Sequence, residues 1–346
     1  VMFVISFLVI LACFYYLSFI DFFDGSLKLV LFTAFAAATM ATVTEGVSRR
    51  GSDNLTIPVS VAFVVHVMIR GGTSLSEQIL IGMLLSLAVA VTSWRIHFLN
   101  ASGAAGAFIL GVVVFGLGGW LWAVPILTFY VTSSLISKLG QTRKKRFDVF
   151  FEKGTIRDIG QVLANGGIAG GVIVIFYFYP SEMAFPFYVG AVSAAAGDTW
   201  ATEIGFFFQR TARNIVNFRK VEIGTSGGVS WPGMIGAALG SALIGASVLM
   251  TDNKLFGASA LPVFFGVVLA GIAGSLMDSL WGATVQSQYH CRVCGKVTEK
   301  QIHCDSRSRL VRGFKFFNND LVNLVCGLAG GFVMVGFMTY AKTGLR

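Results

Sequence analysis

Continuous apolar segments, each about as long as a bilayer is thick, constrain this chain more than any other feature. A helix needs roughly 20 mainly apolar residues to cross the hydrocarbon core. Charged residues make up only 12% of the 346 residues, about half of the roughly 25% typical of soluble domains. The chain cannot cover itself with a charged surface, so we expect an all-α, polytopic integral membrane protein with about eleven transmembrane helices. The predicted spans are 1–20, 27–43, 55–69, 78–94, 101–118, 120–137, 160–179, 186–208, 231–250, 258–284 and 321–339.

The positions of the basic residues predict an orientation. Of the 26 Lys and Arg residues, 21 fall in the second, fourth, sixth, eighth and tenth connections between these spans. Loops rich in Lys and Arg stay on the cytoplasmic side of a membrane. We therefore expect these loops and the N-terminus to be cytoplasmic, in a multi-pass protein of a prokaryotic cell membrane.

The span at 186–208 carries two carboxylates, Asp198 and Glu203. Ionisable groups inside spans cost about 2.5–3.5 kcal/mol each on insertion scales and usually serve a function. Asp198 shares a helix face with Thr202, and Glu203 shares the adjacent face with Thr199. Oxygen ligands of this kind suit Mg²⁺. The alternative is a pair of carboxylates that form salt bridges with neighbouring helices for packing.

A glycine-rich loop follows on the same side of the membrane. It consists of Gly224, Thr225, Ser226, Gly227 and Gly228. Backbone N–H groups of such loops, followed by a helix N-terminus, bind phosphate well, and Lys220 precedes the loop. The alternative is an ordinary glycine-rich turn with Ser230 as the cap of the next helix.

Two more polar segments lie on this side. Asp278 lies on a face of small residues between 271 and 282; that face suits close helix packing, but packing alone does not require the carboxylate. The second segment contains Asn319, Asp320 and Asn323. Their oxygens can hold a metal ion, a ribose or the side chain of a lysine that binds phosphate. The alternative is that Asn318 or Asn319 caps the last helix.

The loop from 138 to 158 supplies basic residues. Attraction to anionic membrane lipids accounts for residues 143–146. Lys138 and Arg157 are better placed to bind a phosphate, and Gln161 and Asn165 follow Arg157 at four-residue spacing.

One further motif predicts a different metal. Its residues are Cys291, Cys294, His303 and Cys304. A Cys-x₂-Cys pair followed by an adjacent His and Cys has spacing suited to structural Zn²⁺.

From about residue 94 to the end, these segments together resemble the transmembrane protein 19 family, which includes the plant phytyl-phosphate kinase of tocopherol synthesis. Seven motifs match in order, at 99–103, 133–138, 157–166, 197–205, 224–230, 274–284 and 318–323. Residues 45–58, in turn, are similar to the C-terminal part of phytol and dolichol kinases, which use CTP. The resemblance implies two membrane domains, a partial alcohol-kinase-like domain at 1–93 and a phytyl-phosphate-kinase-like domain at 94–346.

The resemblance implies a kinase that transfers a phosphoryl group from a nucleoside triphosphate, CTP by this comparison, to an isoprenoid monophosphate. The expected Mg²⁺ ligands are Asp198, Glu203, Asp278 and Asp320. The expected phosphate ligands are Lys220 and the glycine-rich loop for the nucleotide, and Lys138 and Arg157 for the lipid. The isoprenoid chain is expected to lie between helices lined by glycines such as Gly233, Gly236 and Gly240. A transporter or lipid flippase that uses the intramembrane carboxylates is the rival hypothesis, and a scaffold with polar groups used only for packing is a third.

Overall fold

The computed structural model describes residues 1–48, 51–144, 156–208, 211–251 and 260–344, with side chains omitted for 140–144 and 344. The basic side chains predicted at 143–146 lie outside this description. The chain divides into two compact units, Val1–Gly119 and Trp120–Arg346, and we describe each unit by itself.

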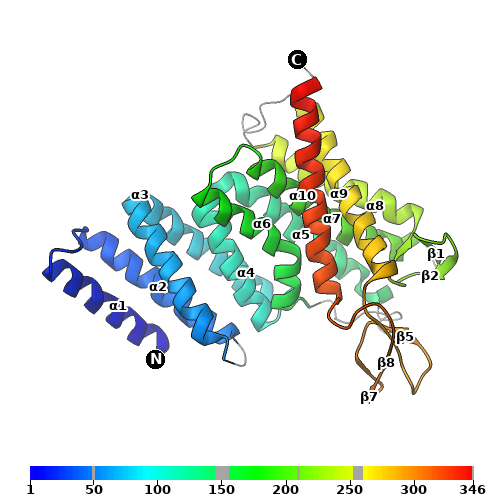
Figure 1. Cartoon of the computed structure of the whole chain (residues 1–346), viewed down its shortest axis with the longest axis horizontal. Coiled ribbons are helices and arrows are strands. Elements are labelled where there is room, and N and C mark those ends of the chain that lie inside the picture. Colours follow the sequence, from blue (N-terminus) through cyan, green and yellow to red (C-terminus); the bar gives the residue numbers. More distant parts are fainter. Residues whose placement is uncertain (49–50, 145–155, 209–210, 252–259, 345–346) are drawn as a thin grey trace. The chain divides into compact units, whose positions relative to one another are not determined.

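Unit 1 is built from helices alone (Figure 1). They are α1 (Met2–Phe19), α2 (Leu27–Val47), α3 (Asp53–Arg95), α4 (Ala101–Val113) and the π-helix η1 (Val114–Gly118). Gly72 interrupts α3 with φ 64° and ψ −161°, a conformation that is open to glycine and costly for other residues. The long helix therefore consists of two straight segments.

Unit 2 is a helical bundle around α7. Its helices are α5 (Gly119–Lys144), α6 (Ile159–Phe178), α7 (Ala184–Phe208), α8 (Trp231–Leu249), α9 (Ala260–Thr284) and α10 (Asn319–Gly344). Helix α7 packs against α6, α8, α9 and α10, and 15 of its 25 residues are buried. The sequence allows this because residues 190–197 are nearly all Gly, Ala or Ser, and small residues let helix backbones approach closely.

Glycines on the surrounding helices complete this packing. A Cβ atom at Gly236 on α8 would lie 2.5 Å from the carbonyl oxygen of Trp200, and one at Gly330 on α10 would lie 2.5 Å from that of Gly190. The glycine face of α8 at Gly233, Gly236 and Gly240 is occupied by α7. The expectation that an isoprenoid chain lies against these glycines is therefore wrong, because Trp200 and its neighbours already fill the space.

Eight helical segments are long and apolar enough to cross a membrane among the described residues, and the prediction of eleven spans is not confirmed. Three differences account for this. One segment, Asp53–Arg95, is as long as two predicted spans, and so is Ala101–Leu139. Helix α7, the predicted span at 186–208, is not among the eight; it carries the two carboxylates and lies surrounded by other helices.

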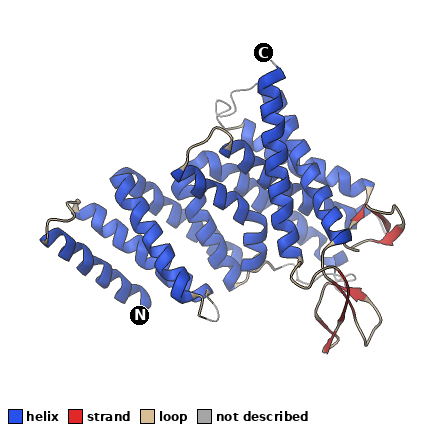
Figure 2. Cartoon of the chain, in the orientation of Figure 1, coloured by secondary structure: helices blue, strands red, loops and turns tan. Residues whose placement is uncertain are grey.

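The expectation of an all-α chain needs a correction, because short strands form in two polar connections (Figure 2). Between α7 and α8, strands β1 (Thr211–Asn214), β2 (Lys220–Glu222) and β3 (Gly228–Val229) form an antiparallel sheet in the order β2-β1-β3. Between α9 and α10, β4 (Gln288–His290), β5 (Val297–Thr298) and β8 (Arg309–Arg312) pair in the order β5-β4-β8, and β6 (Ile302–His303) pairs with β7 (Ser306–Arg307). These connections are too polar to form apolar spans, and strand pairing satisfies their backbone hydrogen bonds.

Candidate functional site

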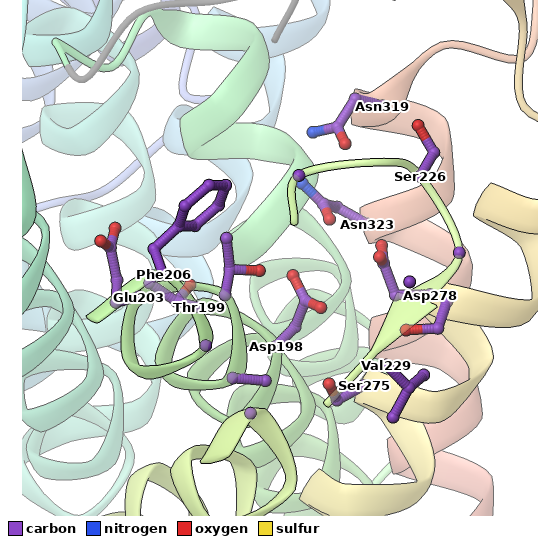
Figure 3. A pocket seen from close by; sticks show the side chains of 18 of the residues that line it. Asp198, Thr199, Glu203, Phe206, Ser226, Val229, Ser275, Asp278, Asn319 and Asn323 are labelled. Carbon is purple, nitrogen blue, oxygen red and sulfur yellow. The ribbon is translucent and has the colours of Figure 1, made fainter. Parts of the chain in front are cut away.

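A polar cavity of about 270 Å³ lies within unit 2. Residues of α5, α6, α7, α8, α9 and α10 line it together with the two connections that contain strands. Figure 3 shows α7 with Asp198, Thr199 and Glu203 on one side, and α9 and α10 with Asp278 and Asn323 on the other. The cavity therefore brings together segments that are up to 186 residues apart in the sequence, from Ser137 to Asn323.

Four carboxylates line the cavity, those of Asp198, Glu203, Asp278 and Glu299. Asp278 lies close enough to Asp198 and Glu299 to interact with both electrostatically. Its Oδ1 atom is buried and has no hydrogen-bond partner among the described residues. Buried polar atoms almost always have a partner, so this oxygen marks a place where a ligand is expected.

Glu203 has a different environment from the other three. It is 2% exposed, and Ser137 Oγ on α5 donates a hydrogen bond of 2.5 Å to its Oε1. Arg157 lies near enough for electrostatic attraction. Glu203 is therefore tied through Oε1 to α5 and lies beside the start of α6, which agrees with a positioning role.

Arg157 is the one Lys or Arg among the described residues that line the cavity. It lies just before α6, with its guanidinium 6.0 Å from the centre of the Phe129 ring. Burial lowers the pKa of Arg157 from its ordinary value, while nearby Tyr130 and Glu203 act in the opposite direction. A guanidinium stays charged at neutral pH, so the described residues give the cavity one permanent positive charge.

Gln161 and Asn165 line the cavity on α6, as their spacing after Arg157 suggests. Gln161 also belongs to a capping box. Its backbone N–H donates to Asp158 Oδ1 at 2.9 Å, and its Oε1 accepts from the N–H of Asp158 at 3.1 Å. The Nε2 group of Gln161 remains as its donor toward the cavity.

The glycine-rich loop closes one side of the cavity, and Gly224 through Gly228 all line it. Gly227 has φ +85°, and a Cβ atom there would lie 2.4 Å from the Cβ of Ala283 on α9. The N–H groups of Ser226 and Gly227 donate no hydrogen bond within the described residues. The loop is thus pressed against a helix end, with two N–H groups left for a ligand. Ser230 caps α8, with its Oγ accepting from the N–H of Gly233 at 3.1 Å.

Two residues that the sequence did not indicate hold this loop in place. Ser226 Oγ donates to Glu299 Oε1 at 2.7 Å, and Gln286 Nε2 donates to the same oxygen at 2.9 Å. Arg312 donates to the carbonyl oxygen of Gly282, at the end of α9, at 2.6 Å and reaches that of Ser226 at 3.5 Å. Burial lowers the pKa of Arg312, which stays charged. No local motif reveals these residues, because their roles depend on contacts 30 to 86 positions away.

At the start of α10, one asparagine caps the helix and two others line the cavity. Asn318 Oδ1 accepts from the N–H of Leu321 at 3.0 Å and caps the helix. This leaves Asn319 and Asn323 to line the cavity. Asp320 is not among the lining residues, so the structure does not group it with the other predicted Mg²⁺ ligands.

Two predicted phosphate ligands lie outside the cavity. Lys220 is exposed on β2, and Lys138 is exposed near the end of α5. On β2 the neighbouring Val221 packs against the buried cluster of Phe206, Ala212 and Ile223. Side chains alternate along a strand, so Lys220 is directed away from that cluster.

The four Cys and His side chains of the α9–α10 connection come together. Ligand atoms of Cys291, Cys294, His303 and Cys304 all lie within 4.8 Å of one another. The Nδ1 atom of His303 is 3.5 Å from the Sγ of Cys294 and 3.2 Å from that of Cys304. A hydrogen bond from the N–H of Cys294, and another from His303, lower the pKa of Cys291 to about 6.

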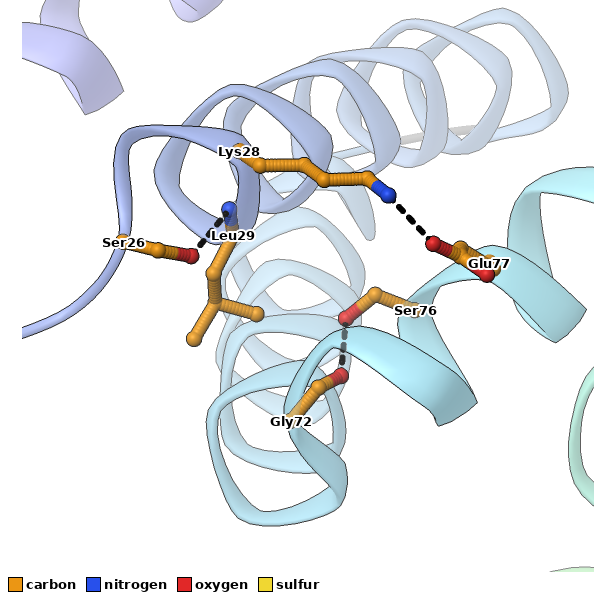
Figure 4. A network of polar contacts seen from close by, with 6 residues as sticks. All are labelled: Ser26, Lys28, Leu29, Gly72, Ser76 and Glu77. Carbon is orange, nitrogen blue, oxygen red and sulfur yellow. Dashed lines mark hydrogen bonds and ion pairs between the residues drawn. The ribbon is translucent and has the colours of Figure 1, made fainter.

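Polar contacts in unit 1 join its own helices (Figure 4). Lys28 at the start of α2 forms an ion pair with Glu77 on α3. Ser76 Oγ donates to the carbonyl oxygen of Gly72 at 2.7 Å, beside the interruption of α3. Ser26 caps α2, with its Oγ accepting from the N–H of Leu29 at 3.2 Å. These contacts lie at helix ends and beside the interruption of α3.

Together, the apolar helices and this cavity define a multi-pass integral membrane protein. Its polar site is closed by a glycine-rich loop, and the charged residues that line the site, among those described, are mostly acidic. The chain belongs to the integral membrane protein family DUF92, whose sequence model matches residues 84–331. The match includes all the residues that line the cavity.

Curated relatives include plant and archaeal proteins. Protein PGR of Arabidopsis thaliana is 31% identical over 283 residues, which cover 75% of this chain and 96% of PGR. A membrane protein of Methanocaldococcus jannaschii is 27% identical over 267 residues, 76% of this chain and 94% of that protein. Protein VTE6, chloroplastic, of Arabidopsis thaliana is 27% identical over 244 residues, 68% of this chain and 64% of VTE6. No solved structure matches this chain.

Proposed function

We propose that the chain is a lipid-phosphate kinase of the membrane, which transfers the terminal phosphoryl group of a nucleoside triphosphate to an isoprenoid monophosphate. The observation that carries the proposal is the meeting of acidic side chains, a glycine-rich loop and one buried guanidinium in a single cavity. Phosphoryl transfer requires positioning and charge neutralisation more than covalent chemistry. Six of the seven motifs that resemble the phytyl-phosphate kinase family, all except 99–103, lie in unit 2, which contains this cavity.

The charges of the cavity support a need for Mg²⁺. Among the described residues, four carboxylates and one guanidinium line it, and this excess of negative charge disfavours a triphosphate without a cation. Asp198 and Asp278 are the proposed ligands, because Asp278 has an oxygen without a hydrogen-bond partner and faces Asp198. Bound there, Mg²⁺ would neutralise charge on the phosphates. Glu203 positions the site through Ser137 and Arg157, and Asp320 stays a more distant candidate.

The loop and Arg157 are proposed to hold the two phosphate groups. The open N–H groups of Ser226 and Gly227 suit the nucleotide triphosphate, and Arg157, with the Gln161 amide, suits the lipid phosphate. An oxygen of the lipid phosphate attacks the terminal phosphorus, and the bond to the bridging oxygen breaks and releases the nucleoside diphosphate. A phosphate monoester is already largely ionised at neutral pH, so no strong base is required.

The size of the cavity limits what it contains. Pockets for drug-sized ligands usually span roughly 300–1,000 Å³, and this cavity measures about 270 Å³. We therefore place the phosphates and the metal inside it, with the base and the isoprenoid chain beyond its walls. Phytyl phosphate as acceptor and CTP as donor follow from the family resemblance. So does the assignment of 1–93 as a partial alcohol-kinase-like domain, which contributes no lining residue.

A cation-coupled transporter or flippase is the second candidate. The position of Asp198 favours a transporter. Asp198 lies about ten residues, or roughly 15 Å, from the end of α7 and thus deep in the bundle. A transporter does not need the glycine-rich loop over its carboxylates, and this loop makes us prefer the kinase. Cytoplasmic placement of the cavity in a prokaryotic cell membrane belongs to the same proposal.

The test is a phosphoryl-transfer assay with purified protein in lipid nanodiscs. Phytyl monophosphate, Mg²⁺ and each of the four common nucleoside triphosphates are supplied, and phytyl diphosphate is measured by mass spectrometry. We expect diphosphate with at least CTP and none from the Asp198→Asn variant. Glu182→Gln is the matched control, because that carboxylate is exposed and pairs with Lys342 outside the cavity. Absence of diphosphate with every nucleotide, in protein that remains folded, would refute the kinase.

A further inference from the structure

The part of the α9–α10 connection that carries the Cys and His side chains, residues 291–312, has almost no apolar core of its own. Within residues 291–312, only Cys291 and Thr298 are buried. Its strands are two to four residues long. So small a folded segment needs a disulfide or a metal to stay ordered, and every cysteine of the chain is a free thiol in the structure.

The four potential ligands converge from two turns. Cys291 and Cys294 flank the turn after β4, where the N–H of Gly295 donates to the carbonyl oxygen of Cys291 at 3.0 Å. His303 and Cys304 belong to the β6–β7 hairpin, in which His303 pairs with Ser306. A tetrahedral Zn²⁺ with bonds of about 2.0–2.3 Å places its ligand atoms roughly 3.3–3.8 Å apart, and the observed atoms lie within 4.8 Å of one another.

The hairpin turn shows that something holds this arrangement. Cys304 and Asp305 both have positive φ, 51° and 55°. Two-residue turns of this kind favour Asn-Gly or Gly-Gly, because most side chains disfavour positive φ. A Cys-Asp pair there is costly by itself, and a metal bond to Cys304 would offset the cost.

We propose that Cys291, Cys294, His303 and Cys304 bind one Zn²⁺, and that this ion holds the glycine-rich loop of the cavity in place. Direct contacts link the segment that carries the zinc ligands to the glycine-rich loop. Glu299 lies between the two ligand pairs and accepts from Ser226 at 2.7 Å. Arg312 ends β8, which pairs with β4 just before Cys291, and donates to the end of α9. Both residues depend on a segment that the metal orders.

This inference does not rest on the proposed kinase activity, because its readouts are metal content and loop protection. Protein purified without a metal-affinity tag is analysed for zinc by mass spectrometry, together with variants Cys304→Ser and His303→Ala. We expect one zinc per chain, and an affinity lowered by more than roughly 100-fold in both variants, since even outer-shell partners account for 10–100-fold. Cys13→Ser is the matched control, because Cys13 is an exposed thiol in α1.

The second readout is hydrogen–deuterium exchange of residues 224–230. Removal of zinc with a chelator should raise the exchange of this loop, and Glu299→Gln should raise it while zinc stays bound. Zinc-free wild-type protein with intact thiols, a disulfide among these cysteines, or full zinc in both variants would overturn the metal site. Unchanged exchange after zinc removal would overturn its link to the cavity.

Discussion

Substitution of Gly227 tests whether the glycine-rich loop must lie tight against α9. Gly227→Ala introduces a Cβ at φ +85°, 2.4 Å from the Cβ of Ala283 and 2.7 Å from its Cα and N atoms. Carbon atoms in contact prefer about 3.5–4.0 Å, so the loop has to retreat by about 1 Å. The left-handed backbone adds about 1–2 kcal/mol. A misplacement of about 1 Å can lower a rate by roughly 100-fold, which is the loss we expect in diphosphate formation.

The control separates the steric clash from the backbone cost. Gly51→Ala has a similar φ of +82°, but its nearest neighbour lies 3.8 Å away, so only the backbone cost applies. Initial rates at saturating lipid phosphate and exchange of residues 224–230 are compared between the two variants. Adding Ala283→Gly to Gly227→Ala should restore part of the activity, since the backbone atoms at 2.7 Å remain. Equal rates and equal exchange in Gly227→Ala and Gly51→Ala would refute the reasoning.

Three other substitutions examine the site and its supports. Asp278→Asn should abolish Mg²⁺-dependent turnover while the unfolding temperature holds or rises, because its repulsion with Asp198 is relieved; a drop of several degrees would contradict this. Arg312→Met removes the bond to the Gly282 carbonyl and should destabilise unit 2 by about 1.5–3 kcal/mol in denaturant titrations, whereas recovery in Arg312→Lys would argue against the need for a guanidinium. Tyr188→Phe removes a buried hydrogen bond to a backbone carbonyl and should cost about 1 kcal/mol of stability with turnover unchanged, and lost turnover would place Tyr188 in the site.

The helices were predictable because each apolar run is about as long as a bilayer is thick. The breaks in these helices were predictable only in part. At Gly72 and Gly119 the backbone has a positive φ, but helical hydrogen bonding resumes within a few residues. The short strands escaped prediction because segments of two to four residues have no periodicity to read. Their pairing joins residues up to 24 positions apart, as Gln288 and Arg312 show.

The polar residues of the cavity were predictable where a motif combined chemistry with spacing. Asp198 and Asp278 stand out because carboxylates in apolar segments are costly. Glu299 and Arg312 could not be singled out, since exposed-looking charges in a polar connection have many possible partners. Lys220 shows the converse, because closeness in sequence to the loop does not decide which side of a strand its side chain occupies.

The positions of the charged residues also change how the excess of Lys and Arg over Asp and Glu is interpreted. The chain carries a net charge of +9, which suggests direct binding of phosphate by Lys and Arg. The described residues that line the cavity have the opposite balance, with four carboxylates and one guanidinium. We therefore expect an anion to bind there together with a divalent cation, and the kinase and the transporter share this requirement for a cation. What separates them is the loop, because two N–H groups without a backbone partner among the described residues can serve an anion and add nothing to the passage of a cation.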